Sequence, residues 1–174
     1  MTSTLAPPTT VHRVTPGDAA RMRALRLEML ADSPLAFLET LAQAAARSHA
    51  DFRRRIVQAS TGNQLAQFVA DPGAGGRLIG HAGGTVLPEE PSATVVFAVY
   101  ITPAARGQGV LPALVDAVAE WSLAIGRREL MLEVVVGNNR AVRAYERLGF
   151  EDTGRRVPHP SVHGLQELQM RRRA

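Results

Sequence analysis

Residues 99–110 read Val-Tyr-Ile-Thr-Pro-Ala-Ala-Arg-Gly-Gln-Gly-Val and form the most informative stretch of the chain. An apolar segment with strand character runs into a loop that contains Gly107 and Gly109, and a helical pattern follows. Glycines let backbone N–H groups approach a ligand closely, and a helix N-terminus carries a partial positive charge. The stretch therefore suits a pyrophosphate, although glycines at such a turn more often serve the turn alone. Its spacing and its lack of lysine exclude a P-loop and a dinucleotide fingerprint.

Upstream of this stretch, the hydrophobic periodicity changes from helical to strand-like. A short strand over residues 11–14 and a turn precede a helix over 19–30, and a second helix is expected over 48–59. The apolar segment between these helices is expected to be partly helical and to cover an edge of the core or a substrate mouth. Three consecutive antiparallel strands should follow, over residues 65–70, 78–87 and 94–101.

Downstream, helices and strands alternate. The pattern predicts elements over residues 110–125 (helix), 129–136 (strand) and 139–148 (helix), a strand beginning near Phe150 and a last strand over 165–170. A strand meander followed by this alternation predicts an α/β (α+β) fold with a mixed, mostly antiparallel central sheet of about six or seven strands flanked by helices.

Length and composition favour one soluble domain. The 174 residues, 45% of them hydrophobic, suffice for a core without a disulfide or metal, so we expect a single domain over residues 11–174. Residues 1–10 carry no basic residue and no apolar core, which predicts a short disordered lead rather than a signal peptide. No apolar run is long enough to cross a bilayer, so we expect a cytoplasmic protein that does not bind membranes.

The residue types limit the chemistry. The chain has no cysteine, which removes thiolate metal sites and a cysteine nucleophile. All twenty basic residues are arginine, so the pI of about 10.8 reflects the arginine pKa more than the net charge of +4. Because aromatic residues make up only 5% and acids are interspersed, we expect no nucleic-acid partner.

A second group of residues follows the strand at 129–136. Asn138 stands where that strand ends and a helix begins, and it is followed by Ala141, Tyr145, Gly149 and Phe150. Each has an ordinary structural explanation. Asn138 suits a helix N-cap, Tyr145 a core aromatic and Gly149 a C-cap.

In this order, the two groups of residues resemble the GNAT family of N-acetyltransferases over nearly the whole chain. The resemblance implies the GNAT fold and acetyl-CoA as acyl donor, without a metal. It places the cofactor on the loop with its flanking residues and on the second group: Val99, Tyr100, Ile101, Arg106, Gly107, Gln108, Gly109, Val110, Leu111, Asn138, Ala141 and Tyr145. It also implies a stabilising backbone N–H near Ile101 and direct attack by the amine.

Leu132-Glu133-Val134 with Tyr145 downstream is similar to the ribosomal-protein alanine acetyltransferases, which implies Glu133 as general base and Tyr145 as general acid. An alkyl ammonium with a pKa of about 10.4 must lose a proton before it attacks, and the thiolate of CoA leaves more easily when protonated. On a solvated face of the strand, Glu133 would instead be an ordinary surface residue. Because the strand at 94–101 has no acid, the pair Glu89 and Glu90 or a water chain are alternatives, and the lone His81 ranks third.

The loop departs from the family pattern at Leu111, where a small residue is usual, and at Pro112. A bulky side chain at Leu111 would hinder backbone approach, and Pro112 removes one N–H, so weaker or displaced binding is expected. Proline does fit the first turn of a helix. This departure keeps a second hypothesis open, a catalytically impaired acyl-CoA-binding regulatory or interaction module.

The acceptor is expected to be the primary amine of a small molecule or of a protein N-terminus. The segments that vary in the family, here residues 35–48 and 157–164, are expected to build its pocket. For the oligomeric state, a homodimer remains an open alternative.

Overall fold

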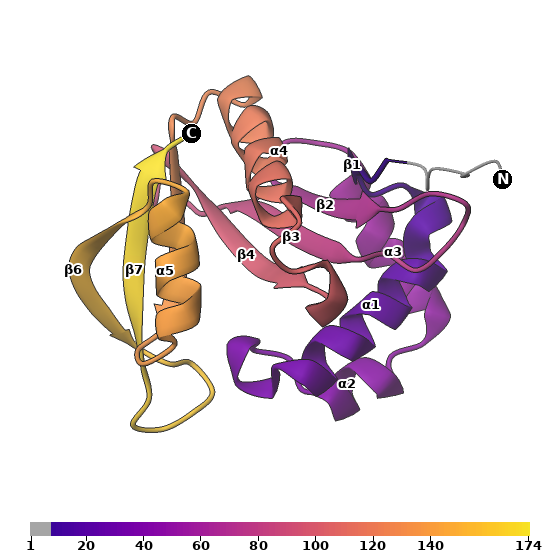
Figure 1. Cartoon of the computed structure of the whole chain (residues 1–174), viewed down its shortest axis with the longest axis horizontal. Coiled ribbons are helices and arrows are strands. Elements are labelled where there is room, and N and C mark those ends of the chain that lie inside the picture. The colour runs from indigo at the N-terminus through magenta and orange to yellow at the C-terminus, as the bar shows by residue number, and fades with distance from the viewer. Residues whose placement is uncertain (1–7) are drawn as a thin grey trace, which may run out of the picture.

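The computed structural model describes residues 8–174 and contains one twisted sheet covered by helices (Figure 1). The strands are β1 Thr10–Arg13, β2 Leu65–Asp71, β3 Gly80–Val86, β4 Ala93–Ile101, β5 Glu129–Val135, β6 Glu151–Pro158 and β7 Gln166–Arg173. The α-helices are α1 Ala19–Asp32, α2 Leu41–Ala46, α3 His49–Ser60, α4 Val110–Ala124 and α5 Asn139–Arg147. Three short 3-10 turns lie at Pro16–Asp18, Pro34–Ala36 and Pro103–Ala105.

The seven strands lie in the order β1-β2-β3-β4-β5-β7-β6. Every neighbouring pair is antiparallel except β4 with β5, which run parallel. Helix α4 supplies the crossover that such a parallel pair requires. The predicted mixed, mostly antiparallel sheet flanked by helices is confirmed.

The parallel pairing of β4 with β5 is short. Only Ala93, Thr94 and Val95 pair with β5, at Glu129, Leu130 and Met131, although both strands continue beyond this register. Past Val95 the two strands diverge, so that β5, β7, β6 and α5 lie on one side of Figure 1 and the N-terminal strands and helices on the other. The edge of β4 that faces β5 is therefore left without a strand partner.

A β-bulge marks the diverging part of β4. The register with β3 shifts between His81 and Gly83, where one extra β4 residue is accommodated. Ala98 lies in this bulge with a φ of +49°, a left-handed conformation that is unfavourable for alanine. His81, which is 2% exposed, donates from Nδ1 to the Ala98 carbonyl at 2.7 Å, and this bond holds the bulge.

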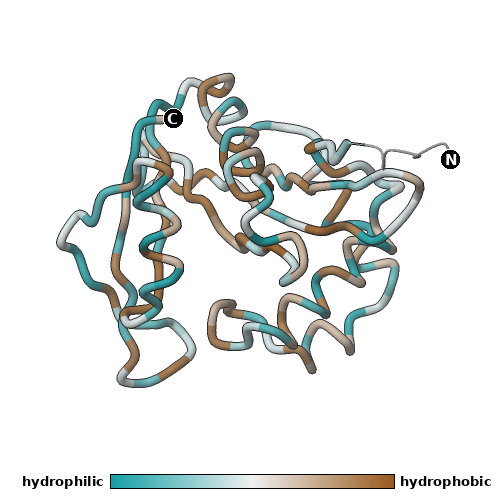
Figure 2. Tube along the Cα trace, in the orientation of Figure 1, coloured by the Kyte–Doolittle hydropathy of each residue, from teal (hydrophilic) through white to brown (hydrophobic). Residues whose placement is uncertain are grey.

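Two hydrophobic clusters lie on the two faces of the sheet. The larger one joins α4 and α5 to the sheet and includes Trp121, Leu132 and Phe150. The smaller one joins α1 and α3 to the other face around Met29, Val69 and Tyr100. In Figure 2 the hydrophobic residues recur along the central strands, whereas β6 at the sheet edge is mostly hydrophilic.

The element boundaries largely follow the periodicity. The first strand begins at Thr10, inside the stretch expected to be a lead, and residues 1–7 of that lead lie outside the described residues. The segment expected to be partly helical contains the 3-10 turn Pro34–Ala36 and helix α2. Across residues 8–174, no helix is long and apolar enough to span a membrane.

Asp18 anchors the start of α1 to the sheet. Its Oδ2 accepts hydrogen bonds from the Thr15 backbone N–H and hydroxyl at 2.8 and 3.0 Å, and its Oδ1 accepts one from Arg21 at 2.7 Å. Arg21 also binds Asp71 at the end of β2 at 2.7 Å. Burial alone would raise the pKa of Asp18, but the hydrogen bonds from Thr15, Arg21 and His12 lower it to about 2.

We predict that Asp18→Asn lowers the free energy of unfolding by about 2 kcal/mol at neutral pH, from the difference between the ordinary pKa of 3.8 and the folded-state value of about 2. Because the folded-state pKa lies below the unfolded one, this contribution is complete above pH ~4 and is lost as the pH falls through ~2. Urea unfolding of both proteins at neutral and acidic pH measures the difference. If the difference in unfolding free energy between the two proteins stays constant down to pH ~2, the lowered pKa of Asp18 is not its cause.

Candidate active site

The loop between β4 and α4 presents a row of free backbone donors. Gly107 and Gly109 have φ values of +77° and +80°, and Gly109 is the N-cap of α4. Within residues 8–174, the N–H groups at positions 107–111 make no hydrogen bond of ordinary geometry. These donors surround the positive end of the helix dipole, which is a ready site for an anion such as a pyrophosphate.

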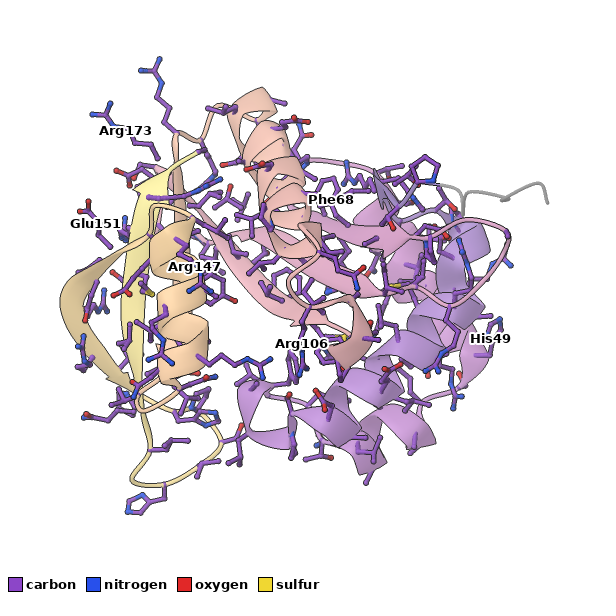
Figure 3. The ribbon with its side chains drawn as sticks, in the orientation of Figure 1. His49, Phe68, Arg106, Arg147, Glu151 and Arg173 are labelled. Atoms are coloured by element: carbon purple, nitrogen blue, oxygen red, sulfur yellow. The ribbon has the colours of Figure 1, made fainter. Side chains whose placement is uncertain are left out.

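The side chain of Arg106 is committed to holding this loop in place. Its Nε donates to the Ile101 carbonyl at 3.1 Å, and its Nη2 contacts Asp32 at the C-terminal end of α1 at 2.7 Å. The guanidinium also lies over the Tyr100 ring, 6.0 Å from its centroid. Figure 3 shows Arg106 between the start of α4 and α1. Arg106 therefore ties the loop to α1, and a ligand would meet the backbone of the loop.

Three further residues of the expected cofactor site lie at the C-terminal end of strand β4. Val99 and Ile101 pack into the cluster under α4, whereas Tyr100 faces α1 and α3 in the other cluster. Burial, together with Asp32 and Glu28, raises the pKa of Tyr100 to about 12. All three side chains are occupied by packing, so β4 can offer a ligand mainly the backbone along its unpaired edge.

The second group of residues shapes both ends of α5. The Asn138 side chain accepts a hydrogen bond from the Ala141 N–H at 3.2 Å, which confirms the N-cap. At the other end, Gly149 has a φ of +83°, its N–H donates to Glu146, and the Phe150 N–H donates to the Tyr145 carbonyl at 3.0 Å. These two bonds are those of a Schellman motif.

The same motif orients Tyr145. Its ring meets Phe150 edge to face, with centroids 5.7 Å apart, and this is the hydrophobic contact that often accompanies a Schellman motif. The ring is half-buried against the cluster that contains Leu132. Its hydroxyl has no hydrogen-bond partner among the described residues, and burial raises its pKa above the ordinary value. Tyr145 is therefore held in place by packing and stays protonated at neutral pH.

Glu133 lies on the other face of β5. Its neighbours Leu132 and Val134 are buried under α5, so alternation along the strand turns Glu133 to the opposite face, where it is exposed. Val95 pairs with Met131, so Glu133 shares this face with the β4 residue Phe97. Glu133 and Tyr145 thus flank β5 from opposite sides.

Two nearby residues were missed by the sequence reasoning. Glu167 on β7 is diagonal to Glu133 on the same face, because Glu133 pairs with Gln169. Burial and the negative charge of Glu133 raise the pKa of Glu167. Nε2 of His159 lies 4.0 Å from Glu167, while its Nδ1 accepts hydrogen bonds from the Ser161 and Val162 N–H groups. The sequence analysis points to the segment 157–164, which contains His159, but singles out neither residue.

The helix α5 carries a row of exposed arginines. Arg140, Arg143 and Arg147 follow one another at helical spacing, and all three are exposed. None of them forms an ion pair within the described part of the chain. Figure 3 shows Arg147 on α5 and, apart from it, Arg106 by the start of α4. This arginine stripe is available to an anionic ligand.

Comparisons with known proteins agree with this geometry. Residues 30–150 match the model of the acetyltransferase (GNAT) family. The chain belongs to this family. A probable N-acetyltransferase of Mus musculus, family 8 member 5, is 29% identical over 134 residues, which are 75% of this chain and 56% of that protein. The chain thus spans little more than half the length of this curated relative.

Solved GNAT structures share the fold. An acetyltransferase of the GNAT family from Streptococcus pneumoniae superposes with a TM-score of 0.78 at 17% identity, covering 95% of this chain and 99% of that one. A phosphinothricin acetyltransferase from Sinorhizobium meliloti, crystallised with acetyl-CoA, has a TM-score of 0.74 at 22% identity and covers 95% and 88% of the two chains.

The GNAT loop of this chain tolerates its two unusual residues. Pro112 lies in the first turn of α4, where a missing N–H costs no helical hydrogen bond. Leu111 is partly buried and packs against the cluster under α4. The side chain turns toward the core while its N–H stays free, so it does not block the loop backbone. Weaker acyl-CoA binding stays a prediction.

The alternative bases of this GNAT chain are unfavourably placed. Glu90 forms an ion pair with Arg171 beside the start of β4, and Glu89 is in the same turn, at the opposite end of the strand from the bulge. His81 holds the bulge, and burial lowers its pKa to about 4, although its Nε2 has no partner. Its position supports a structural role. Within residues 8–174 no group of three or more acidic or histidine side chains could hold a metal.

We predict that Gly109→Ala weakens acetyl-CoA binding by about tenfold or more, because Cβ strain at a φ of +80° moves donors that contact a charged group. Gly126→Ala, at the other end of α4 with a φ of +82°, is the matched control. Both variants should lose about 1–2 kcal/mol of stability. Calorimetric titration with acetyl-CoA measures the difference, and equal affinities in the two variants would contradict a role for the loop.

Proposed function

We propose that this GNAT domain transfers an acetyl group from acetyl-CoA to a primary amine, of a small molecule or a protein N-terminus, by direct attack. The observation that carries the proposal is the placement of Glu133 and Tyr145 on opposite faces of β5, beside the point where β4 and β5 diverge. An acceptor and a thiol leaving group can then approach from different sides, each with its own proton-transfer residue.

The loop before α4 fits the pyrophosphate of the donor. Five consecutive N–H groups at residues 107–111 are free, and they lie at the N-terminus of a fifteen-residue helix. The arginine stripe of α5 adds uncompensated positive charge. Acetyl-CoA supplies the activated acetyl thioester, and the chain supplies the anion site and the unpaired edge of β4 for its positioning.

Glu133 is the proposed base. A primary ammonium with a pKa of about 10.4 is almost wholly protonated at neutral pH, so deprotonation must precede attack. Glu133 is an exposed carboxylate on the face of the sheet that Phe97 shares, and Glu167 beside it adds a second negative charge. Both charges attract an ammonium ion, and Glu133 can accept its proton directly or through water.

Tyr145 is the proposed acid. The departing CoA sulfur needs a proton, and the Tyr145 hydroxyl has no partner in the described part of the chain. Its raised pKa keeps the proton in place at neutral pH, and the Schellman motif of α5 fixes the ring. No covalent intermediate with the enzyme is required.

An acyl-CoA-binding regulatory module without catalysis is the competing proposal. It predicts that acetyl-CoA binds, whereas no amine causes thiol release. Release of CoA thiol, measured with a panel of primary amines and amino-terminal peptides, distinguishes the two. Thiol release above the hydrolytic background supports the transferase, and its absence across the panel in protein that binds acetyl-CoA supports the module.

We predict that Tyr145→Phe lowers kcat by on the order of a hundredfold while acetyl-CoA affinity and the thermal midpoint stay nearly unchanged, because the ring keeps its contact with Phe150. Steady-state thiol release with the best acceptor measures kcat. Near-normal turnover in the variant would show that Tyr145 serves packing alone.

We predict that Glu133→Gln lowers turnover at neutral pH by about a hundredfold or more and that this loss shrinks as the pH rises, since more of the amine is already neutral. The pH profile of kcat/KM measures the effect. Glu167→Gln, which removes the same charge from the same face, is the matched variant. A larger, equally pH-dependent loss in Glu167→Gln would assign the base to Glu167 instead.

A further inference from the structure

A hollow of about 670 Å³ lies between α3 and the sheet. Its helical wall carries the guanidinium groups of Arg54 and Arg55, with Arg47 just before the helix, and its sheet wall includes Gln67 on β2 and Phe97 on β4. Its size is that of a small-molecule site. Of its lining residues, only Arg47 lies in a segment, 35–48, that the sequence analysis expects to build the acceptor pocket.

The hollow carries an excess of positive charge. Arg47, Arg54 and Arg55 line it, and Asp51 is the one acidic residue in its wall. Arg54 is paired with Asp51, and Arg47 with Glu39. Arg55 has no ion-pair or hydrogen-bond partner among the described residues. A guanidinium in this state presents several N–H donors to a carboxylate or a phosphate.

Phe97 connects the hollow to the proposed reaction centre. It precedes Ala98 of the β4 bulge directly, and its ring covers Gly83 of β3, where any Cβ would overlap the ring. The ring therefore lies on the face of the sheet that also carries Glu133. An acceptor whose amine approaches Glu133 can extend along this face toward α3.

We propose that this hollow binds an anionic group, a carboxylate or a phosphate, of the amine acceptor. This inference rests on the proposed function and narrows the acceptor to amines that also carry a negative charge. Arg55 is the specificity-determining residue, since its donors are uncommitted, while the paired Arg47 and Arg54 add to the local positive field. The amine and the anion are then recognised at opposite ends of the acceptor, by carboxylates and by guanidinium groups.

The test uses the full chain and compares acceptors that share a scaffold but differ in negative charge. Amino acids are paired with their amides, O-phosphoethanolamine with ethanolamine, and peptides beginning with aspartate with those beginning with asparagine. Arg55→Gln should raise KM for the charged member of the preferred pair by about tenfold or more and leave KM for its neutral partner and for acetyl-CoA unchanged. The pair that the enzyme prefers shows whether the anionic group of the acceptor is a carboxylate or a phosphate. It also shows whether the acceptor is a free amino acid or a peptide.

Arg53→Gln is the matched control, because it removes the same charge from an exposed position of α3 outside the hollow. Equal effects of Arg53→Gln and Arg55→Gln, or a general preference for neutral acceptors, would overturn the proposal. Calorimetric binding of the anionic acceptors themselves provides a readout that needs no turnover. If the anionic acceptors bind, and Arg55→Gln abolishes this binding while Arg53→Gln preserves it, the hollow is supported as the anion site. If no amine is acetylated in addition, only the proposed function is contradicted. If charged amines are acetylated but Arg55→Gln changes neither their KM nor their binding, the hollow is not the anion site, and the proposed function stands.

Discussion

The early end of the parallel pairing between β4 and β5 is the constraint on which the rest of the structure depends. A parallel pair that continued in register would satisfy the backbone of both strands and leave no edge for a ligand. Here the pairing stops at Val95, and the bulge at Ala98 bends β4 as it leaves its neighbour. Left-handed alanine costs about 1–2 kcal/mol, so the bulge must be held by its surroundings. The buried His81, neutral at ordinary pH because burial lowers its pKa to about 4, supplies the hydrogen bond that holds it.

The two parts of the sheet are then joined by contacts on one face. The cluster under α4 and α5 continues from Val110 and Leu114 across to Leu132 and Phe150, so the diverging strands share a core. Arg172 of β7 reinforces the C-terminal part, because it donates to the Leu148 carbonyl at 2.8 Å and lies over the Phe150 ring. The other face receives α1 and α3 only on the N-terminal part. This asymmetry leaves Glu133 exposed while Tyr145 is held by packing.

Local patterns in the sequence were sufficient for the order of elements, the loop after β4 and the caps of α5. Each depends on a few neighbouring residues, such as Asn138 with Ala141 or Gly149 with Phe150, whose chemistry is local. The same reasoning could not find the partners of Arg106 or Glu90, because Asp32 and Arg171 are 74 and 81 residues away in the chain. Sequence reasoning also missed the packing of Leu111. A sequence does not show which face of the first turn of a helix lies against the core. Glu167 and the hollow beside α3 depend on strand register and on helix placement, which are tertiary properties.

The hydrogen-bond partners of the arginines explain part of a composition in which every basic residue is arginine. Many arginines hold the backbone where elements end: Arg13 donates to the carbonyls of Ala59, Gly62 and Leu65, and Arg127 to that of Ala93. The planar fork of arginine suits such multiple contacts better than the single ammonium of lysine. These residues contribute to the net charge of +4 while their guanidinium groups bind backbone carbonyls. Other arginines have no internal partner among residues 8–174, such as the stripe on α5 and Arg55 in the hollow that Phe97 also lines. Helix α5 packs in the cluster on one face of the sheet and α3 in the cluster on the other, so this unpaired positive charge is divided between the two faces. In the proposed function these two faces serve the donor and the acceptor.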